Sequence, residues 1–172
     1  MNLRHWLILF CAHLLTACHF AKSSRYIDPI TFYRLEKADR LAQQGNCTES
    51  IKIEEAVLDS LMQSGRAKSE AAARVMAGIT ICYRKIGNYV AAQRYINKSI
   101  QIFTSLHGEI NSDVLNSKSA LANTLYLAGD YPLAEKMYAE LLKTNQQQAK
   151  PDWTKISLGF QKLGDVQLAE GD

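Results

Sequence analysis

The stretch LAGDYPLAEKMYAELL, residues 127–142, contains the end of one helix, a turn and the start of a second helix. Gly129 tolerates the left-handed backbone conformation with which many helices end. Asp130 is a turn former whose carboxylate can cap the helix that follows. Beyond the turn, apolar residues such as Met137 and Leu141 recur at the spacing of one helix face. The stretch therefore predicts two helices joined by a tight turn.

The same pattern occurs twice more along the chain, which indicates an internal repeat. The matching stretches are LAQQGNCTESIKIEEAVL at 41–58 and YRKIGNYVAAQRYINKSI at 83–100. The turn glycines Gly45, Gly87 and Gly129 lie 42 residues apart, and the same interval leads on to Gly171. A period of about 20–50 residues is typical of solenoid proteins, in which each repeat packs only against its neighbours.

Small side chains recur at matching positions on both sides of each turn, where two antiparallel helices would cross closely. They are Ala38, Thr80, Ala122 and Gly164 before the turn, and Ser50, Ala92 and Ala134 after it. The first copy fits least well, because Lys37 and Glu54 stand where apolar residues are expected and Cys47 replaces a tyrosine. The end of a solenoid faces water on one side, so an atypical terminal repeat is expected. Glu54 and Glu55 are accordingly expected on a solvated helix face.

The pattern resembles the tetratricopeptide repeat in its variant of about 42 residues, which is found in kinesin light chains. The resemblance covers residues 31–172, and its strongest motifs are LAGDYPLAEKMYAELL and GNYVAAQRYINKSI. It implies an all-α fold: a tetratricopeptide-type solenoid of helical hairpins over residues 29–172, with three repeats plus one terminal helix. Asp28 and Pro29 are expected as the N-cap and the first residue of the opening helix.

The last predicted helix, residues 155–170, would be the first helix of a fourth repeat. Its apolar side consists of Ile156, Phe160, Leu163 and Val166. A second helix would normally follow the turn at Gly171 and Asp172. Three interpretations are open: the single helix caps the third repeat, its unpaired apolar face binds a second copy or a partner, or the sequence is truncated.

In the family that this pattern resembles, the first helix of each repeat lines a concave groove that binds partner proteins. Carrying the family's groove positions over to this chain gives Asp39, Gln43, Arg74, Ile81, Arg84, Lys85, Asn116, Ser119, Asn123 and Tyr126. Asn116 and Asn123 share a helix face, where amide side chains would suit the backbone of an extended peptide. Arg74, Arg84 and Lys85 would favour an acidic segment of the partner. The alternative is an ordinary polar surface.

The first residues of the chain are typical of a secretory signal peptide. Arg4 precedes the apolar run WLILFCAHLL, which is shorter than the ~20 apolar residues that a membrane-spanning helix needs. The run leads into LTAC, residues 15–18, which resembles the lipobox of bacterial lipoproteins. The resemblance implies that residues 1–17 are a lipoprotein signal peptide and that Cys18 is lipidated. An ordinary signal peptide with a chance cysteine, or an uncleaved anchor, are the alternatives.

Residues 18–28 would then form a tether between the lipid and the solenoid. Several acyl chains, such as palmitate, give stable anchoring where one chain does not. An aspartate directly after the lipidated cysteine retains lipoproteins of enteric bacteria at the inner membrane, and here that position is His19. We therefore expect a lipid-anchored protein of the outer membrane that faces the periplasm. An inner-membrane lipoprotein and a secreted protein are the alternatives.

Cys47 and Cys82 are the cysteines that remain once the signal peptide is removed and Cys18 is lipidated. Cys47 is expected at the start of the second helix of repeat one, and Cys82 near the end of the first helix of repeat two. Neighbouring helices of a solenoid bring these regions together, and the periplasm is oxidising. A disulfide is one interpretation, and a pair of buried free thiols is the other.

No pattern of catalytic or cofactor-binding residues accompanies the repeats. The sequence contains no phosphate-binding glycine loop, no HExxH and no GxSxG motif. Cys47 and Cys82 have no histidine neighbours in sequence, which makes a poor zinc site. His107, within SLHGE, is expected in a solvated loop. We therefore expect neither enzyme activity nor a metal nor a cofactor.

The composition is that of one ordinary globular domain, with 172 residues, 47% hydrophobic residues and a net charge of +3. So small a charge argues against a broad nucleic-acid footprint. The expected function is a lipid-anchored scaffold or adaptor that binds a peptide or partner protein in the bacterial envelope. The alternatives are a self-associating structural subunit that uses the C-terminal helix, and a pilotin-like assembly factor.

Overall fold

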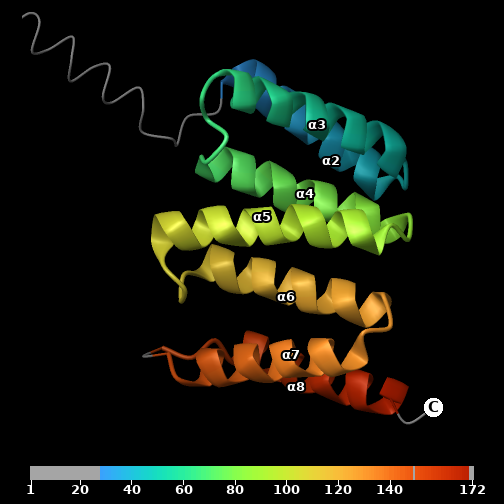
Figure 1. Cartoon of the computed structure of the whole chain (residues 1–172), viewed down its shortest axis with the longest axis vertical. Coiled ribbons are helices and arrows are strands. Elements are labelled where there is room, and N and C mark those ends of the chain that lie inside the picture. Colours follow the sequence, from blue (N-terminus) through green and yellow to red (C-terminus); the bar gives the residue numbers. More distant parts are fainter. Residues whose placement is uncertain (1–27, 149, 171–172) are drawn as a thin grey trace, which may run out of the picture.

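The computed structural model describes residues 28–148 and 150–170, and every regular element within them is a helix (Figure 1). The helices are α2 (Pro29–Gln43), α3 (Cys47–Gln63), α4 (Glu70–Lys85), α5 (Tyr89–His107), α6 (Ser112–Leu127), α7 (Tyr131–Gln146) and α8 (Trp153–Glu170). Helices α2–α3, α4–α5 and α6–α7 form hairpins that stack along one axis. The predicted all-α solenoid of three hairpins and a terminal helix is confirmed. The predicted signal peptide and all but the last residue of the tether lie outside the described residues.

Each hairpin is closed by the turn that the repeat predicts. Gly45, Gly87 and Gly129 have φ angles of +84°, +76° and +83°, in the left-handed region that glycine adopts without steric cost. The amide after each glycine donates to a carbonyl in the last turn of the preceding helix, at 2.8, 2.9 and 3.0 Å. This bond is characteristic of a Schellman motif, so the three glycines end α2, α4 and α6 in the same way.

The predicted capping residues lie at the starts of the helices. The side chains of Asn88 and Asp130 each accept a hydrogen bond from an amide in the first turn, at 3.1 and 3.4 Å. Asn46 is the N-cap of α3 without a side-chain hydrogen bond. Asp28 caps α2 with an accepted hydrogen bond of 2.9 Å, and Pro29 is its first residue. The opening helix therefore begins where the sequence predicts.

The core lies between the paired helices, where the recurring small side chains are buried. The buried small residues are Ala38, Ser50, Thr80, Ala92, Ala122 and Ala134. Ser50 Oγ donates to the carbonyl of Ala38 at 2.9 Å and so joins α3 to α2. Ser99 Oγ donates to the carbonyl of Ala73 at 2.8 Å and joins α5 to α4. Close helix crossing thus lets side chains reach the backbone of the partner helix.

Helix α8 packs against α7 and adds the buried side chains of Ile156 and Val166 and the half-buried Leu163, as predicted. The prediction that Phe160 shares this face is wrong, because its side chain is 57% exposed. Phe160 lies on the outer side with Trp153 and Leu168, which are also exposed. Apart from the backbone of α8 itself, no described atom lies within 4 Å of where a Cβ on Gly164 would stand. Gly164, the small residue of the fourth copy, is therefore not packed against a second described helix as Ala38, Thr80 and Ala122 are.

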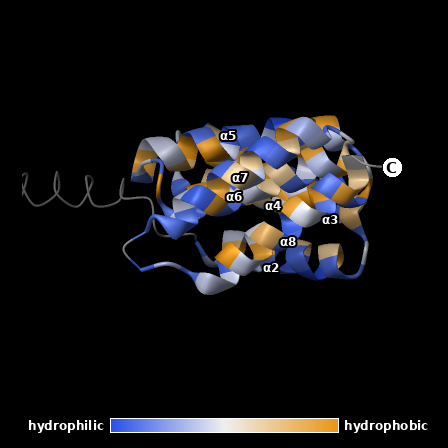
Figure 2. Cartoon of the chain, turned by 90° about the horizontal axis from the view of Figure 1, so that it is seen from below, coloured by the Kyte–Doolittle hydropathy of each residue, from blue (hydrophilic) through white to orange (hydrophobic). Residues whose placement is uncertain are grey.

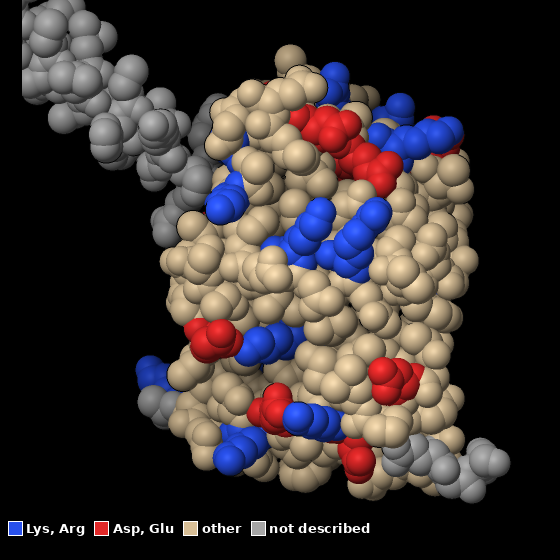
Figure 3. Space-filling view, in the orientation of Figure 1, with Lys and Arg blue, Asp and Glu red and all other residues tan. Residues whose placement is uncertain are grey.

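Viewed along the stack, α2 and α8 lie on one side of the molecule and α5 lies on the other (Figure 2). The face in Figure 3 carries small groups of basic and acidic side chains, with wide uncharged areas between them. That face therefore lacks the broad basic field that a nucleic acid would need. Among the helices described, none has the length and apolar character needed to span a bilayer.

Candidate functional site: a groove along the first helices

Three hollows lie between the successive first helices of the repeats. The hollow between α2 and α4 has a volume of about 280 Å³, and the hollow between α4 and α6 about 350 Å³. A third, of about 180 Å³, lies between α6, α7 and α8. Arg74 and Gly78 border the first two hollows, and Asn116 borders the second and third. Because neighbouring hollows share residues, they form one continuous surface, which we call the repeat groove.

Most of the predicted groove residues border this surface. They are Asp39, Arg74, Ile81, Arg84, Asn116 and Ser119. Gln43 and Asn123 border none of the three hollows, and neither do Lys85 and Tyr126. Lys85 Nζ donates to the carbonyl of Ala42 at 2.6 Å, so it ties α4 to the end of α2. The Tyr126 ring instead packs against a neighbouring tyrosine, with centroids 5.6 Å apart.

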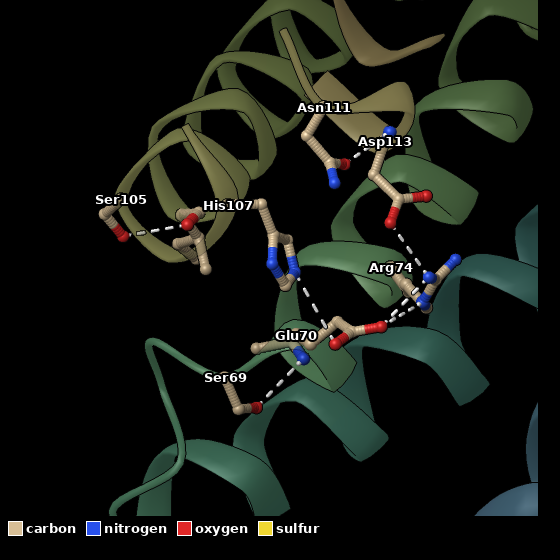
Figure 4. A network of polar contacts seen from close by, with 9 residues as sticks. Ser69, Glu70, Arg74, Ser105, His107, Asn111 and Asp113 are labelled. Atoms are coloured by element: carbon tan, nitrogen blue, oxygen red, sulfur yellow. Dashed lines mark hydrogen bonds and ion pairs between the residues drawn. The ribbon is translucent and has the colours of Figure 1, made fainter. Parts of the chain in front are cut away.

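Arg74 is held at the edge of the groove by a network that joins α4, α5 and α6 (Figure 4). Its Nη2 atom donates to Glu70 Oε1 at 2.9 Å and to Asp113 Oδ2 at 3.0 Å. Its guanidinium lies 5.7 Å from the centroid of the Phe103 ring. His107 Nε2 lies 3.6 Å from Glu70 Oε2. The prediction that His107 lies in a loop is wrong, because α5 continues through this residue.

The same network brings metal-ligating atoms close together. Glu70, His107 and Asp113 each place one such atom within 4.8 Å of the others. Arg74 donates to both carboxylates, so a cation would compete with the guanidinium for the same oxygens. The arrangement is therefore that of a salt-bridge network that positions Arg74.

Glu54 lies on the floor of the first hollow, beside Gly78. The prediction that Glu54 is solvated is wrong, because its side chain is only 8% exposed. The hollow that Glu54 borders is otherwise lined by residues of α2 and α4, so these two helices flank the Glu54 side chain. A Cβ at position 78 would collide with Glu54 Oε1, so glycine is what leaves room for the carboxylate. Glu55 faces other partners and accepts hydrogen bonds from the hydroxyls of Tyr83 and Tyr95, at 3.1 and 2.8 Å.

The position of Glu54 changes its acidity. Burial raises the pKa of Glu54 from the usual 4.5 to about 7, and the charge of Asp39 adds to the increase. Ser50 opposes it as a hydrogen-bond partner, and Glu55 adds a smaller increase. The Ser50 hydroxyl lies 3.5 Å from Glu54 Oε2 but 2.9 Å from the carbonyl of Ala38, so the carboxyl is weakly bonded. Glu54 is therefore partly ionised near neutral pH.

Arg84 supplies a positive charge to the hollow between α4 and α6. Burial lowers the pKa of Arg84, and the nearby Tyr138 acts in the opposite direction. Burial also raises the pKa of Tyr138 to about 12, against the effect of Arg84. An arginine stays protonated despite such a shift. No carboxylate among the described residues forms an ion pair with Arg84, so its charge is available to a ligand.

Cys47 and Cys82 lie together in a buried cluster with Ile51, as their predicted positions on α3 and α4 imply. Both are free thiols in this structure. Burial raises the pKa of Cys82 to about 11, and its contact with Cys47 adds to the increase. The structure therefore places the two predicted cysteines side by side in one buried cluster, as thiols.

Comparison with known proteins identifies similar structures but no similar sequence family. No protein-family model matches the sequence, and no curated protein matches it either. BtubC (BKLC) from P. vanneervenii is similar in structure, with a TM-score of 0.75 at 22% identity over 86% of this chain and 60% of that chain. The fold is a tetratricopeptide-like repeat solenoid.

Two further structures support this fold. Both are of a putative kinesin light chain from Podosopora anserina with nearly identical TPR-like repeats, one of them with a single substitution. Their TM-scores are 0.72 and 0.71 at 15% and 16% identity, over 85% and 81% of this chain and 70% and 66% of those chains. The chain thus spans about 60% of the length of BtubC. Sequence identities this low establish the fold alone.

Glu54 and Gly78 are among the groove residues that were not predicted from the sequence. The signal for Glu54 was its place at an apolar position of the first repeat. The signal for Gly78 was a glycine inside a helix, which costs about 1 kcal/mol relative to alanine and therefore calls for a packing reason. Each signal has an explanation only when α3 and α4 are seen in contact.

Proposed function

We propose that this protein is a lipid-anchored scaffold of the bacterial envelope that binds an extended segment of a partner protein in the repeat groove. The observation that carries the proposal is the continuity of the groove, because its hollows share Arg74, Gly78 and Asn116. Directly packed helices lie roughly 8–10 Å apart, so a path across the more loosely spaced α2, α4, α6 and α8 is at least roughly 24–30 Å long. An extended segment of at least about eight residues, at ~3.3 Å each, would cover that path.

The side chains along the groove support a peptide ligand. Asn116 is exposed and offers both a donor and an acceptor, which suits a peptide backbone. Arg84 adds a permanent positive charge, and the side chain of Ile81, which is 44% exposed, adds apolar surface. Hydrogen-bonding groups and apolar contact together are typical of peptide-binding surfaces.

The groove assignment is tested by partner capture from detergent-solubilised envelopes. Arg84→Glu reverses the charge in the groove, and Asn116→Ala removes the amide. We expect each to lower recovery of partner proteins at least fivefold. Lys98→Glu is the matched control, since it reverses an exposed charge on α5, outside the hollows. If all variants recover the same partners in equal amounts, the groove is not the binding site.

The lipid anchor is the second part of the proposal, and its support is the LTAC motif at residues 15–18. Cys18 would carry the lipid, and the tether up to Asp28 would reach roughly 30 Å when extended. With His19 after the cysteine, the outer membrane facing the periplasm is the proposed location. Cys18→Ala should abolish metabolic labelling with palmitate and release the protein from the membrane fraction. A variant that is still acylated would contradict this assignment.

A second candidate function is self-association through α8. The outer side of this helix exposes three large apolar side chains, Trp153, Phe160 and Leu168, which are 73%, 57% and 75% exposed. Gly164 leaves an uncovered notch on the same helix. A pilotin-like assembly role would use both surfaces, with the groove binding the substrate protein.

A further inference from the structure

We propose that the α2–α4 end of the repeat groove binds a cationic side chain, a lysine or an arginine, of the partner segment. The site is the hollow bordered by Glu36, Asp39 and Glu54, and we call it the acidic hollow. The inference rests on the proposed function and adds the chemistry of the partner. The sequence-based expectation of an acidic partner segment therefore applies to the next hollow, which Arg84 borders. The acidic hollow would bind a basic residue of the same segment.

The first argument is the state of the Glu54 carboxyl group. Glu54 is more than nine-tenths buried as a residue, yet it borders the hollow. Its hydrogen-bond partner among the described residues is Ser50 Oγ at 3.5 Å, and Ser50 is closer to the carbonyl of Ala38. Within the described part of the chain, no cation forms an ion pair with Glu54. A buried carboxylate without a close donor gains strongly from a cation that reaches it.

The second argument is the balance of charge around the hollow. Glu36 and Asp39 from α2 and Glu54 from α3 line it, and none of the three forms an ion pair with a described residue. Arg74 is the cation that borders it, and its guanidinium already donates to Glu70 and Asp113. The hollow therefore has an excess of negative charge, which complements a positive side chain.

The third argument is the shape and lining of the hollow. Apolar side chains form its walls: Phe32, Leu35 and Val75. Phe32 is 57% exposed and so is available to a ligand. Lysine and arginine carry long apolar stems below their charged groups, and such stems pack against apolar surface. The lining thus suits a long cationic side chain better than a bare metal ion. Gly78 has no side chain to fill the space above the carboxylate.

The site has a pH dependence that follows from its geometry. The titratable and charged groups near Glu54 are Glu36 and Asp39 from α2, Glu55 on its own helix, and Arg74 and Cys82 from α4. Since the pKa of Glu54 is raised to about 7, the carboxyl becomes ionised as the pH rises through neutral. Binding of a cation should therefore tighten as the pH rises through neutral, and a bound cation should lower the pKa of Glu54.

The test is an NMR titration of the full, isotope-labelled chain with acetylated and amidated pentapeptides. The probe has four alanines around a central lysine, and the comparison peptides carry norleucine or glutamate there. We expect the lysine peptide to shift the Gly78 amide and the Glu54 carboxyl resonance. It should bind at least fivefold more tightly than the norleucine peptide at pH 8, with the preference reduced at least twofold at pH 5.5.

The variants separate a binding role from a structural one. Glu54→Gln and Gly78→Ala should each reduce the preference for lysine at least threefold. Glu49→Gln, which changes an exposed carboxylate of the same helix, should leave it unchanged. Equal binding of lysine and norleucine peptides, or no lysine-induced shift at millimolar concentration, would overturn the site. Full lysine preference in Glu54→Gln would also overturn it.

The proposed function and this site can fail separately. Partner capture that depends on Arg84 but is the same for wild type and Glu54→Gln retains the scaffold function and rejects the acidic hollow. Capture that depends on neither residue rejects the groove itself. Loss of capture with Arg84→Glu and with Glu54→Gln, but not with Glu49→Gln, supports both.

Discussion

At the residue scale, Glu54 is the side chain that departs most from the repeat pattern. It is a buried carboxyl group at a position where an apolar residue is expected, and it is accommodated because residue 78 on α4 is a glycine. Burial removes water from this carboxyl group, and the charges of Asp39 and Glu55 further disfavour its ionisation. The free energy of ionising Glu54 is therefore coupled to the free energy of folding.

We predict that stability falls as the pH rises through the range from about 4.5 to about 7. In this range the folded state keeps a proton on Glu54 that the unfolded state has released, so deprotonation favours unfolding. Below the range both states are protonated, and above it the full penalty applies. The pKa difference corresponds to roughly 3 kcal/mol. Glu54→Gln should remove this loss and be more stable than wild type at pH 8, by up to ~3 kcal/mol, in urea denaturation.

Glu55→Gln is the control for this prediction. Glu55 accepts hydrogen bonds from Tyr83 and Tyr95, so neutralising it weakens two charge-assisted bonds. We expect a destabilisation of about 1–3 kcal/mol at pH 8, opposite in sign to the effect of Glu54→Gln. A Glu54→Gln variant that is destabilised by the same amount at pH 5 and pH 8 would contradict the burial argument.

At the element scale, the turn glycines and the glycines within helices have different roles. Gly87 has a φ of +76° between α4 and α5, where a side chain is sterically unfavourable. Gly164 lies inside α8, and a Cβ there would meet no atom within 4 Å. Substitution to alanine should therefore have opposite effects at the two positions.

We predict that Gly87→Ala destabilises the protein by about 1–2 kcal/mol, because alanine is strained in the left-handed conformation. Gly164→Ala should stabilise it by about 0.5–1 kcal/mol, because alanine favours the helix and has room. Thermal unfolding of the two variants and wild type under one condition measures both effects. A loss of stability in Gly164→Ala would mean that another helix covers this position of α8.

At the scale of the whole molecule, the groove and the outer side of α8 both follow from stacking. Each first helix after α2 packs mainly on the second helix of the repeat before it, which leaves hollows between successive first helices. These hollows share Arg74, Gly78 and Asn116. No described helix lies over the outer side of α8, and Trp153 and Phe160 are exposed there.

We predict that any self-association of the chain depends on this outer side. Phe160→Gln removes an exposed apolar ring, and it should lower the association constant at least tenfold in sedimentation equilibrium if α8 forms the contact. Val90→Gln is the control, since Val90 is 82% exposed on α5, away from α8. Concentration-dependent dimerisation that Phe160→Gln leaves unchanged would place the contact elsewhere.

Much of the groove could be predicted from the repeat register, since Asp39, Arg74, Ile81 and Arg84 all border it as expected. Lys85 differs because the end of α2 lies within its reach, and its amine donates to a backbone carbonyl there. The repeat pattern predicts which side of a helix faces the groove. It does not predict whether a long side chain such as that of Lys85 reaches a hydrogen-bond acceptor on another helix.

The sequence by itself determined the period, the helices and the turns, because glycine, asparagine and aspartate act on the backbone within a few residues. It also determined that Cys47 lies near Cys82, since a repeat places neighbouring helices in a known order. Only the tertiary structure decided that Glu54 is buried, that Phe160 is exposed and that Arg74 is held by two carboxylates. These outcomes depend on atoms from other helices. Their physical origin is burial and charge at close range, which local sequence does not contain.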